Sequence, residues 1–221
     1  MSVHKSKHIT TVFAVLIFLI SSCGIEDAQQ YLFYQPRTNS ESPTSINFYP
    51  PEQYETQFTG IDIYYKIYAS KTDADADASS FSVRQDADII PGSSIVAYLL
   101  SPNALNYHRL YNYTQQSRFV ITKSLIPSTN NLVTFELTVI NELLFKIDNI
   151  EVAKLYRNTA TDTIPFSMQP NQSDSDFKYS SNDQDPQFYI QLYAVSYGYT
   201  NLLKPIFSKA VKIGVLSIVY N

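Results

Sequence analysis

Apolar and polar residues alternate along most of the chain with a period of two, which is typical of strands that bury one face. Clusters of Pro, Asn, Asp and Ser separate the alternating stretches. Helical signals are weak, and the best is Ser101 followed by Pro102, which has the form of a helix start. We expect strands at 44–49, 60–69, 93–100, 117–125, 131–140, 150–157, 187–199 and 206–219. This pattern predicts an all-β fold, an antiparallel sandwich of two sheets.

Two of the expected strands, 60–69 and 187–199, have one aliphatic face and one face rich in tyrosine. If the two strands are neighbours, five tyrosines line one outer face of a sheet: Tyr64, Tyr68, Tyr189, Tyr193 and Tyr197. A tyrosine ring offers a flat apolar surface with a polar tip, which suits contact with a protein or a glycan. The alternative is that the long segment between the strands packs over this face and makes it a second core.

The beginning of the chain has the pattern of an export signal. Lys5 and Lys7 precede an apolar run at 9–20, which is shorter than the roughly 20 residues that cross a bilayer. The sequence Ile20-Ser21-Ser22-Cys23 then resembles the lipobox of bacterial lipoproteins. The resemblance implies that residues 1–22 are removed and that Cys23 carries a diacylglycerol and an acyl chain such as palmitate. Two alternatives are an ordinary signal peptide, which leaves Cys23 as a free thiol, and a retained anchor helix.

The segment Phe58 to Tyr68 resembles the central third strand of a fibronectin type III domain, and Phe188 to Gly198 with the stretch after Pro205 is similar to its last two strands. The chain lacks the Trp of that family and has a long insertion. We therefore expect a lipidated N-terminus and tether at 23–43 and an immunoglobulin-like or fibronectin type III-like sandwich at 44–221, with the insertion at about 70–186. The lipobox, the tyrosine-rich strands and the polar loops together also resemble uncharacterised lipoproteins of spirochaetes, which implies no activity.

Charge excludes one large class of partners. The net charge is -4 and the isoelectric point is near 5.3, so the chain has no basic field to neutralise phosphates, and we expect no nucleic-acid binding. Removal of the signal peptide takes away two lysines and no acidic residue, which makes the protein more negative. We therefore expect the lipid on Cys23, and not electrostatic attraction, to hold the protein at a membrane.

Few residues could carry catalysis or bind a metal. His108 is the single histidine after the signal peptide, Cys23 is the single cysteine, and the five glycines are too scattered to form a phosphate-binding loop. Asp73-Ala-Asp-Ala-Asp77 looks like the start of a calcium loop, but Ala78 and Arg84 replace the Gly and Glu that such a loop needs. We interpret this stretch as an acidic loop, and a second stretch likewise: Asp174, Asp176, Asp183 and Asp185.

These observations predict a protein of the bacterial cell envelope that is anchored by lipid at Cys23 and is not an enzyme, with a role in interaction or structure. We expect no catalytic residue, no metal and no cofactor. A second hypothesis is a periplasmic or surface-exposed lipoprotein that binds a ligand or a glycan in a pocket between the sandwich and the insertion. A third is an enzyme that uses paired carboxylates, although no spacing in the sequence suggests a pair.

Overall fold

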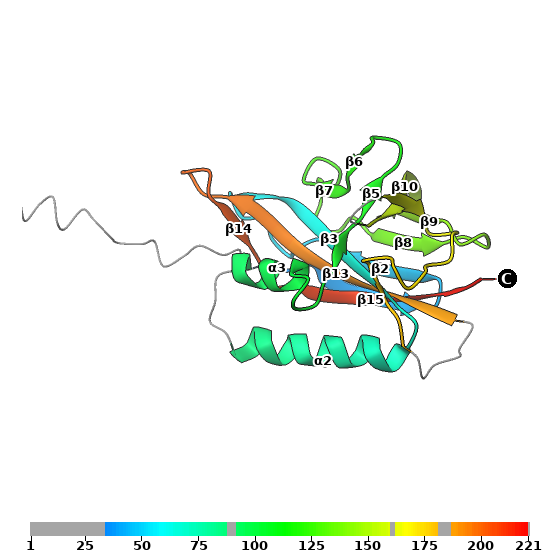
Figure 1. Cartoon of the computed structure of the whole chain (residues 1–221). Helices are drawn as coiled ribbons and strands as arrows, with labels where there is room; N and C mark the ends of the chain where they lie inside the picture. Colours follow the sequence, from blue (N-terminus) through cyan, green and yellow to red (C-terminus); the bar gives the residue numbers. More distant parts are fainter. Residues whose placement is uncertain (1–33, 88–91, 160–161, 181–186, 221) are drawn as a thin grey trace, which may run out of the picture. The chain divides into compact units, whose positions relative to one another are not determined.

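The computed structural model describes residues 34–87, 92–159, 162–180 and 187–220, which form two β-sheets (Figure 1). The strands of the first sheet are β1 (Arg37–Ser42), β2 (Ser45–Tyr49), β5 (Tyr111–Asn112), β6 (Ser117–Arg118), β8 (Val133–Leu137), β9 (Leu143–Ile147), β10 (Ile150–Asn158) and β11 (Thr163–Pro165). Their order is β1-β2-β8-β9-β10-β5-β6, and β11 pairs with β10. All pairs in this sheet are antiparallel.

The second sheet is built on two long central strands. Its members are β3 (Phe58–Tyr68), β4 (His108–Arg109), β7 (Val120–Thr122), β12 (Phe177–Lys178), β13 (Gln187–Tyr199), β14 (Pro205–Phe207) and β15 (Val211–Val219). β13 pairs with β3 along one edge and with β15 and β14 along the other. β7, β4 and β12 follow one another along the outer edge of β3, and β12 runs parallel to it. The expected all-β sandwich is confirmed, and the strands at 60–69 and 187–199 are neighbours.

The main core lies between the sheets, where the aliphatic faces of the strands meet. Alternation along β2 turns Ile46 and Phe48 inward, and both are fully buried. Phe135 on β8 pairs with Ile46, and Phe145 on β9 pairs with Phe135, so these rings lie beside them on the same inward face of the first sheet. Phe119 packs edge-on against Phe145 with ring centroids 4.8 Å apart. Burial of a large apolar side chain stabilises a fold by about 1.5–3 kcal/mol, so this layer is the main source of stability.

Connections between the sheets close the two sides of the sandwich. On one side, β4 and β7 belong to the second sheet while β5 and β6, which lie between them in sequence, belong to the first. Leu110 and Phe119 mark the crossing, and the Phe119 N–H donates to the Leu110 carbonyl at 2.8 Å. On the other side, the Ser217 N–H of β15 donates to the Pro43 carbonyl at 2.7 Å.

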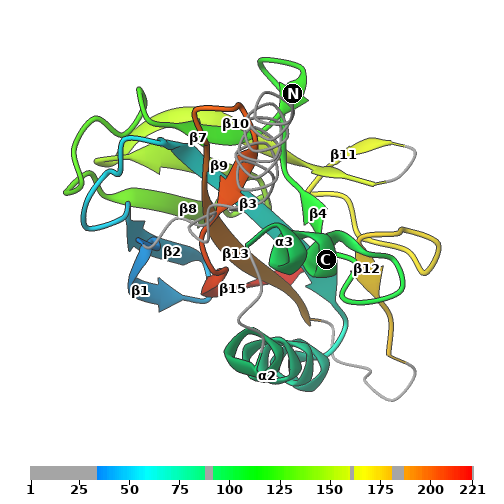
Figure 2. The same ribbon diagram turned by 90° about the vertical axis from the view of Figure 1, so that its left-hand side faces the viewer.

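Two helices cover the outer face of the second sheet (Figures 1 and 2). These are α2 (Lys71–Ala87) and α3 (Gly92–Leu100). The expected strand at 93–100 is therefore wrong: Ile95, Val96 and Leu99 recur with helical spacing, and all three are buried. The expected helix start at Ser101 is a turn. Neither of these two described helices is long and apolar enough to cross a membrane.

The acidic stretch from Asp73 to Asp77 is also helical, where we expected a loop. It forms the first half of α2, in which alanine favours the helix and Asp73 lies in the first turn, where its charge is favourable. Successive aspartates of this stretch are two residues apart and point in different directions on a helix, so the three carboxylates cannot converge on one ion as they would in a loop.

Candidate functional site

The structure brings the five tyrosines onto one face of the second sheet. Tyr68 pairs with Tyr189 across β3 and β13, and Tyr64 pairs with Tyr193. Tyr64, Tyr68 and Tyr193 are at most 3% exposed. Tyr189 and Tyr197, nearer the two ends of β13, are half-buried. The first three tyrosines are therefore not an open binding face, because the insertion packs over them and makes a second core.

This second core is aromatic. Phe81 of α2 packs edge-on against Tyr193 with ring centroids 5.3 Å apart, and Tyr107 does the same at 5.4 Å from another side. The apolar residues of α3 and Leu105 complete the layer. Burial raises the pKa of Tyr64, Tyr107 and Tyr193 above the ordinary value, because the ionised phenolate loses its hydration.

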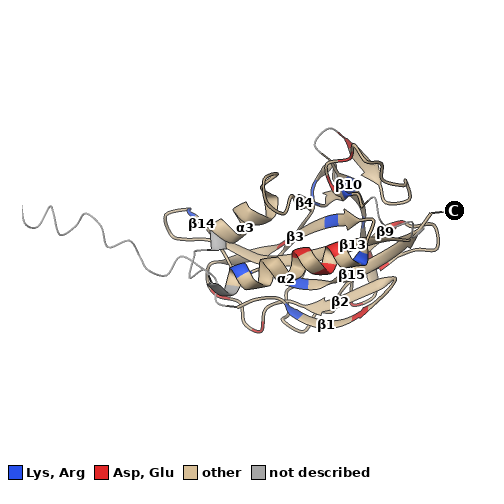
Figure 3. Cartoon of the chain, turned by 60° about the horizontal axis from the view of Figure 1, so that its bottom comes forward, with Lys and Arg blue, Asp and Glu red and all other residues tan. Residues whose placement is uncertain are grey.

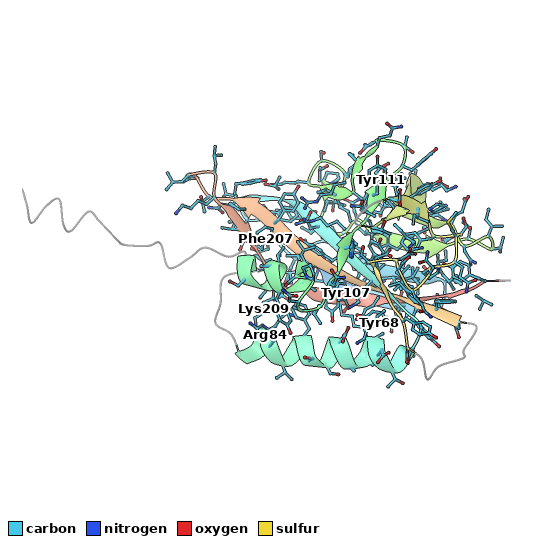
Figure 4. All side chains as sticks on the ribbon, in the orientation of Figure 1. Tyr68, Arg84, Tyr107, Tyr111, Phe207 and Lys209 are labelled. Atoms are coloured by element: carbon cyan, nitrogen blue, oxygen red, sulfur yellow. The ribbon has the colours of Figure 1, made fainter. Side chains whose placement is uncertain are left out.

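A buried network of polar groups lies between α2 and the end of β3, where Figure 4 shows Tyr68 and Tyr107. The Tyr68 hydroxyl lies 3.0 Å from both the Asp77 carboxylate and the Tyr107 hydroxyl. Tyr107 in turn donates to the side-chain oxygen of Gln191, whose amide group donates to the Ala74 carbonyl of α2 at 3.1 Å. The network therefore joins the helix to both central strands through hydrogen bonds.

Lys66 is the buried cation of this network. Its ammonium group donates to the Leu105 carbonyl at 2.5 Å and lies 3.6 Å from Asp77, which also accepts a hydrogen bond from Lys178 at 2.9 Å. Burial lowers the pKa of Lys66, although the charge of Asp77 opposes the change. A lysine of this kind can act as a base or nucleophile where a substrate reaches it, but here the helix and the aromatic layer enclose it.

A second buried ionic cluster lies at the end of β10. Arg157 is fully buried and donates to Asp176 at 2.7 and 3.0 Å and to Asp174 at 2.6 Å. Asp176 also accepts a hydrogen bond from the Tyr65 hydroxyl at 2.6 Å. Asp174 and Asp176 therefore fix the segment that precedes β12 against the sandwich, contrary to our interpretation of a free acidic loop. Asp183 and Asp185 lie outside the described residues.

Neither acidic stretch forms a metal centre in the described part of the chain. Three of the four acidic positions of α2, Asp73, Asp75 and Asp77, lie in its first half, beside basic positions of the helix and the sheet (Figure 3). Asp75 bonds Lys71 at 2.7 Å and lies 3.5 Å from Lys212, while Asp77 faces Lys66. No group of three metal-ligating side chains is found among the described residues.

A pocket of about 370 Å³ opens beside β4. Its walls come from the segment after α3, from β4, from the end of β10 and from the segment before β12: Leu100, Pro102, Asn106, Tyr107, His108, Arg109, Asn158 and Ser175. We expected a pocket between the insertion and the sandwich. The pocket is instead lined only by residues of the expected insertion at about 70–186. Amide, imidazole and guanidinium groups beside apolar walls suit a small polar ligand.

His108 is held by the backbone at the edge of this pocket. Its Nδ1 lies 2.9 Å from the Asn158 carbonyl, which can only accept, so Nδ1 carries the proton. The other ring nitrogen, Nε2, is buried and has no hydrogen-bond partner among the described groups. The next residue, Arg109, lies 5.3 Å from the centre of the Tyr64 ring and 3.8 Å from Asp62.

Sequence reasoning missed Lys66, Arg157 and the pocket. Lys66 has a weak signal, because it is a charged residue between buried aromatic and aliphatic neighbours in a long strand. Arg157 has none, since its partners become neighbours only in the folded chain. Cys23, the expected lipidation site, lies outside the described residues.

Comparison of the chain with models of known protein families, with curated proteins and with solved structures finds no match in any of the three. The arguments about function therefore rest on the residues and the geometry described above.

Proposed function

We propose that this protein is a lipoprotein of the bacterial cell envelope, anchored by lipid at Cys23, with a non-enzymatic role in interaction or envelope structure. One observation carries the proposal: the single cysteine of the chain directly follows Ile20-Ser21-Ser22 at the end of a short apolar run. Two or three acyl chains on one residue hold a protein stably at a bilayer, at about 0.8 kcal/mol for each buried CH₂ group.

The described structure agrees with this role in two respects. The first strand begins at Arg37, 14 residues after Cys23, so a short linker separates the proposed lipid from the folded domain. The buried charged groups, Lys66 and Arg157, are paired with carboxylates and bind parts of the fold to one another. The first feature leaves room for the folded domain near a lipid on Cys23, and the second stabilises that domain.

Replacement of the anchor residue tests the proposal. We expect the wild-type protein made in a bacterial host to partition into detergent and the Cys23→Ala variant to move almost completely into the aqueous phase, because only the wild type carries acyl chains. Phase separation followed by mass spectrometry of the N-terminal peptide measures both properties. A Ser22→Ala variant, which keeps a small residue before the cysteine, is the matched control and should stay in detergent. Retention of Cys23→Ala in detergent would contradict the proposal.

The pocket beside β4 supports a second candidate function, the binding of a small ligand or glycan by the anchored domain. Sugar hydroxyls both donate and accept, so they can pair with the side chains of Asn106, Asn158 and Arg109. Leu100 and Pro102 offer an apolar wall for the face of a ring.

Calorimetric titration with glucose and N-acetylglucosamine tests this second function. If a sugar binds, we expect Asn158→Ala to weaken its affinity by about tenfold, since loss of one hydrogen bond costs up to about 1.5 kcal/mol. The backbone groups of Asn158, which bond Tyr65 and His108, are unchanged by this replacement. Asn103→Ala, at an exposed position outside the pocket lining, is the control. Equal affinity in wild type and Asn158→Ala would exclude the pocket as the binding site.

A further inference from the structure

The hairpin between β13 and β14 carries two leucines in full contact with solvent. Leu202 is 81% exposed and Leu203 is 80% exposed. Backbone hydrogen bonds fix the turn, because the Thr200 N–H donates to the Lys204 carbonyl and the Leu203 N–H donates to the Thr200 carbonyl, both at 2.9 Å. The leucines are therefore presented at the apex of an ordered turn.

The backbone makes Leu203 more unusual. Its φ of 60° is in the left-handed region, which suits Gly and Asn and disfavours a branched apolar residue. Six described non-glycine residues have a positive φ, and the five others are Asn, Asp or Gln: Asn106, Gln116, Asn141, Asp148 and Asn149. Neither the turn geometry nor exposure to water favours leucine at this position.

The chemistry around the leucines is that of a membrane interface. Tyr199 is half-exposed behind them, and its ring packs edge-on against that of Tyr197. Lys204 follows directly and is exposed, and the turn from Tyr199 to Pro205 contains no acidic residue. Apolar side chains at a tip, with tyrosine and lysine behind them, match the order of acyl chains and headgroups in a bilayer.

The path of the chain places this tip at the end of the sandwich where the tether enters. Arg37, at the start of β1, donates to the Pro50 carbonyl at 3.1 Å, and the Tyr199 N–H donates to the Gln57 carbonyl at 3.3 Å. Pro50 and Gln57 are the two ends of the connection between β2 and β3, so both contacts are made to this one connection. Figure 1 shows the β13–β14 turn at the end of the described domain opposite the turn between β8 and β9. The turn between β8 and β9, with exposed Val139 and Ile140, lies at the opposite end, where Asn141 bonds the Val219 carbonyl.

Length also favours the β13–β14 end. The 14 residues from Cys23 to Arg37 span at most about 50 Å. A strand of 13 residues such as β13 is about 40 Å long. A lipid on Cys23 can therefore hold the β13–β14 turn at the bilayer with a slack tether, whereas contact through Val139 would need a tether extended along nearly the whole domain.

We propose that Leu202 and Leu203 insert into the outer part of the bilayer to which Cys23 is anchored, so that the domain stands on the membrane at its β13–β14 end. This inference rests on the lipid anchoring proposed above. The occupant is the lipid itself, of any headgroup, because the contact is apolar and the negative protein has no electrostatic attraction to anionic lipid.

The absence of tryptophan from the chain allows a clean test. Full-length Leu202→Trp and Val139→Trp variants are made in a host that lipidates them and are reconstituted into phosphatidylcholine vesicles, with or without brominated acyl chains. We expect L202W fluorescence to shift to shorter wavelength and to lose most of its intensity with brominated lipid. V139W, at the opposite end, should keep the emission of a residue in water. Adding Leu203→Asn to L202W should reduce the quenching without unfolding the domain, since asparagine suits the positive φ.

The outcomes separate this inference from the anchoring on which it rests. Quenching of L202W alone supports insertion of the tip. If both variants float with the vesicles but neither is quenched, or both are quenched equally, the tip inference is overturned while the anchor stands. If the emission of L202W shifts to shorter wavelength at high protein concentration without vesicles, the tip contacts a second copy of the protein. That result would also overturn the tip inference. Failure of either protein to float with vesicles would instead refute lipid anchoring.

Discussion

Raising the pH above about 10 is expected to unfold this domain cooperatively. Burial raises the pKa of five fully buried tyrosines above the ordinary value of 10.0: Tyr64, Tyr65, Tyr68, Tyr107 and Tyr193. The folded state keeps these protons while the unfolded state loses them, so the stability they contribute is present below pH 10 and falls as the pH rises further. At pH 11 the unfolded state gains roughly 1 kcal/mol from each tyrosine that it deprotonates. Five buried tyrosines together therefore remove several kcal/mol, which is comparable to the total stability of a typical domain.

Lys66 acts in the opposite direction but cannot compensate. Its pKa is lowered in the folded protein, so its contribution to stability rises with pH and reaches its limit near the ordinary value of 10.5. It exchanges one proton, whereas the tyrosines exchange five. Urea denaturation between pH 8 and pH 11, followed by circular dichroism, measures the balance.

Tyr193→Phe is the matched variant for the alkaline transition. Tyr193 makes ring contacts with Phe81 and Tyr107, which phenylalanine keeps. We expect unchanged stability at pH 8 and a dependence on pH that is weaker by about one proton above pH 10. If the free energy of unfolding of the wild type stayed constant up to pH 11, this result would contradict the conclusion that the tyrosines under α2 and α3 are buried.

Replacement of Arg157 by methionine is expected to destabilise the domain by about 3–5 kcal/mol, because it leaves Asp176 buried without its counter-charge. Asp176 is fully buried and receives two hydrogen bonds from Arg157, so the loss exceeds that of an ordinary ion pair. Burial by itself lowers the pKa of Arg157, but the hydrogen bonds to Asp176 and Asp174 outweigh this effect and raise the pKa above its ordinary value. Urea denaturation at pH 7 measures the effect.

Two controls identify the cause of this loss. Lys71→Met removes one partner of an exposed pair between residues four apart on α2, and we expect a change below about 0.5 kcal/mol. The double variant Arg157→Met/Asp176→Leu removes both buried charges and should recover part of the lost stability. A double variant less stable than Arg157→Met alone would show that packing, and not the unpaired charge, explains the result.

The proposed function depends on few residues, but they have different kinds of support. The argument for Cys23 rests on sequence, since that residue lies outside the described part of the chain. The arguments for Leu202 and Leu203 rest on backbone geometry and exposure, which no pattern in the sequence displays. If both the Cys23→Ala partitioning and the L202W quenching give the expected results, the domain is held at a bilayer by a covalent lipid and oriented by an apolar turn.

Local patterns in the sequence determined the sandwich and its central strands. Strand alternation has a period of two and depends only on near neighbours, so the inward and outward faces of β3 and β13 could be read directly. The same reasoning misplaced 93–100, because a short apolar run fits a buried strand and a buried helix equally well. It also treated Asp73 to Asp77 as a loop, because closely spaced aspartates are typical of a solvated acidic segment. In the fold, Asp75 and Asp77 lie beside Lys71, Lys66 and Lys212 instead.

Only the tertiary structure decided whether the tyrosine face was open or covered, how Arg157 is paired and where the β13–β14 turn lies relative to the tether. Each of these depends on contacts between residues far apart in the chain, such as Tyr193 with Phe81 or Arg157 with Asp176. Alternation shows which side chains share a face, because the backbone alone fixes that geometry. Which segment packs against that face depends on contacts with residues that are distant in the sequence, and a local pattern does not contain that information.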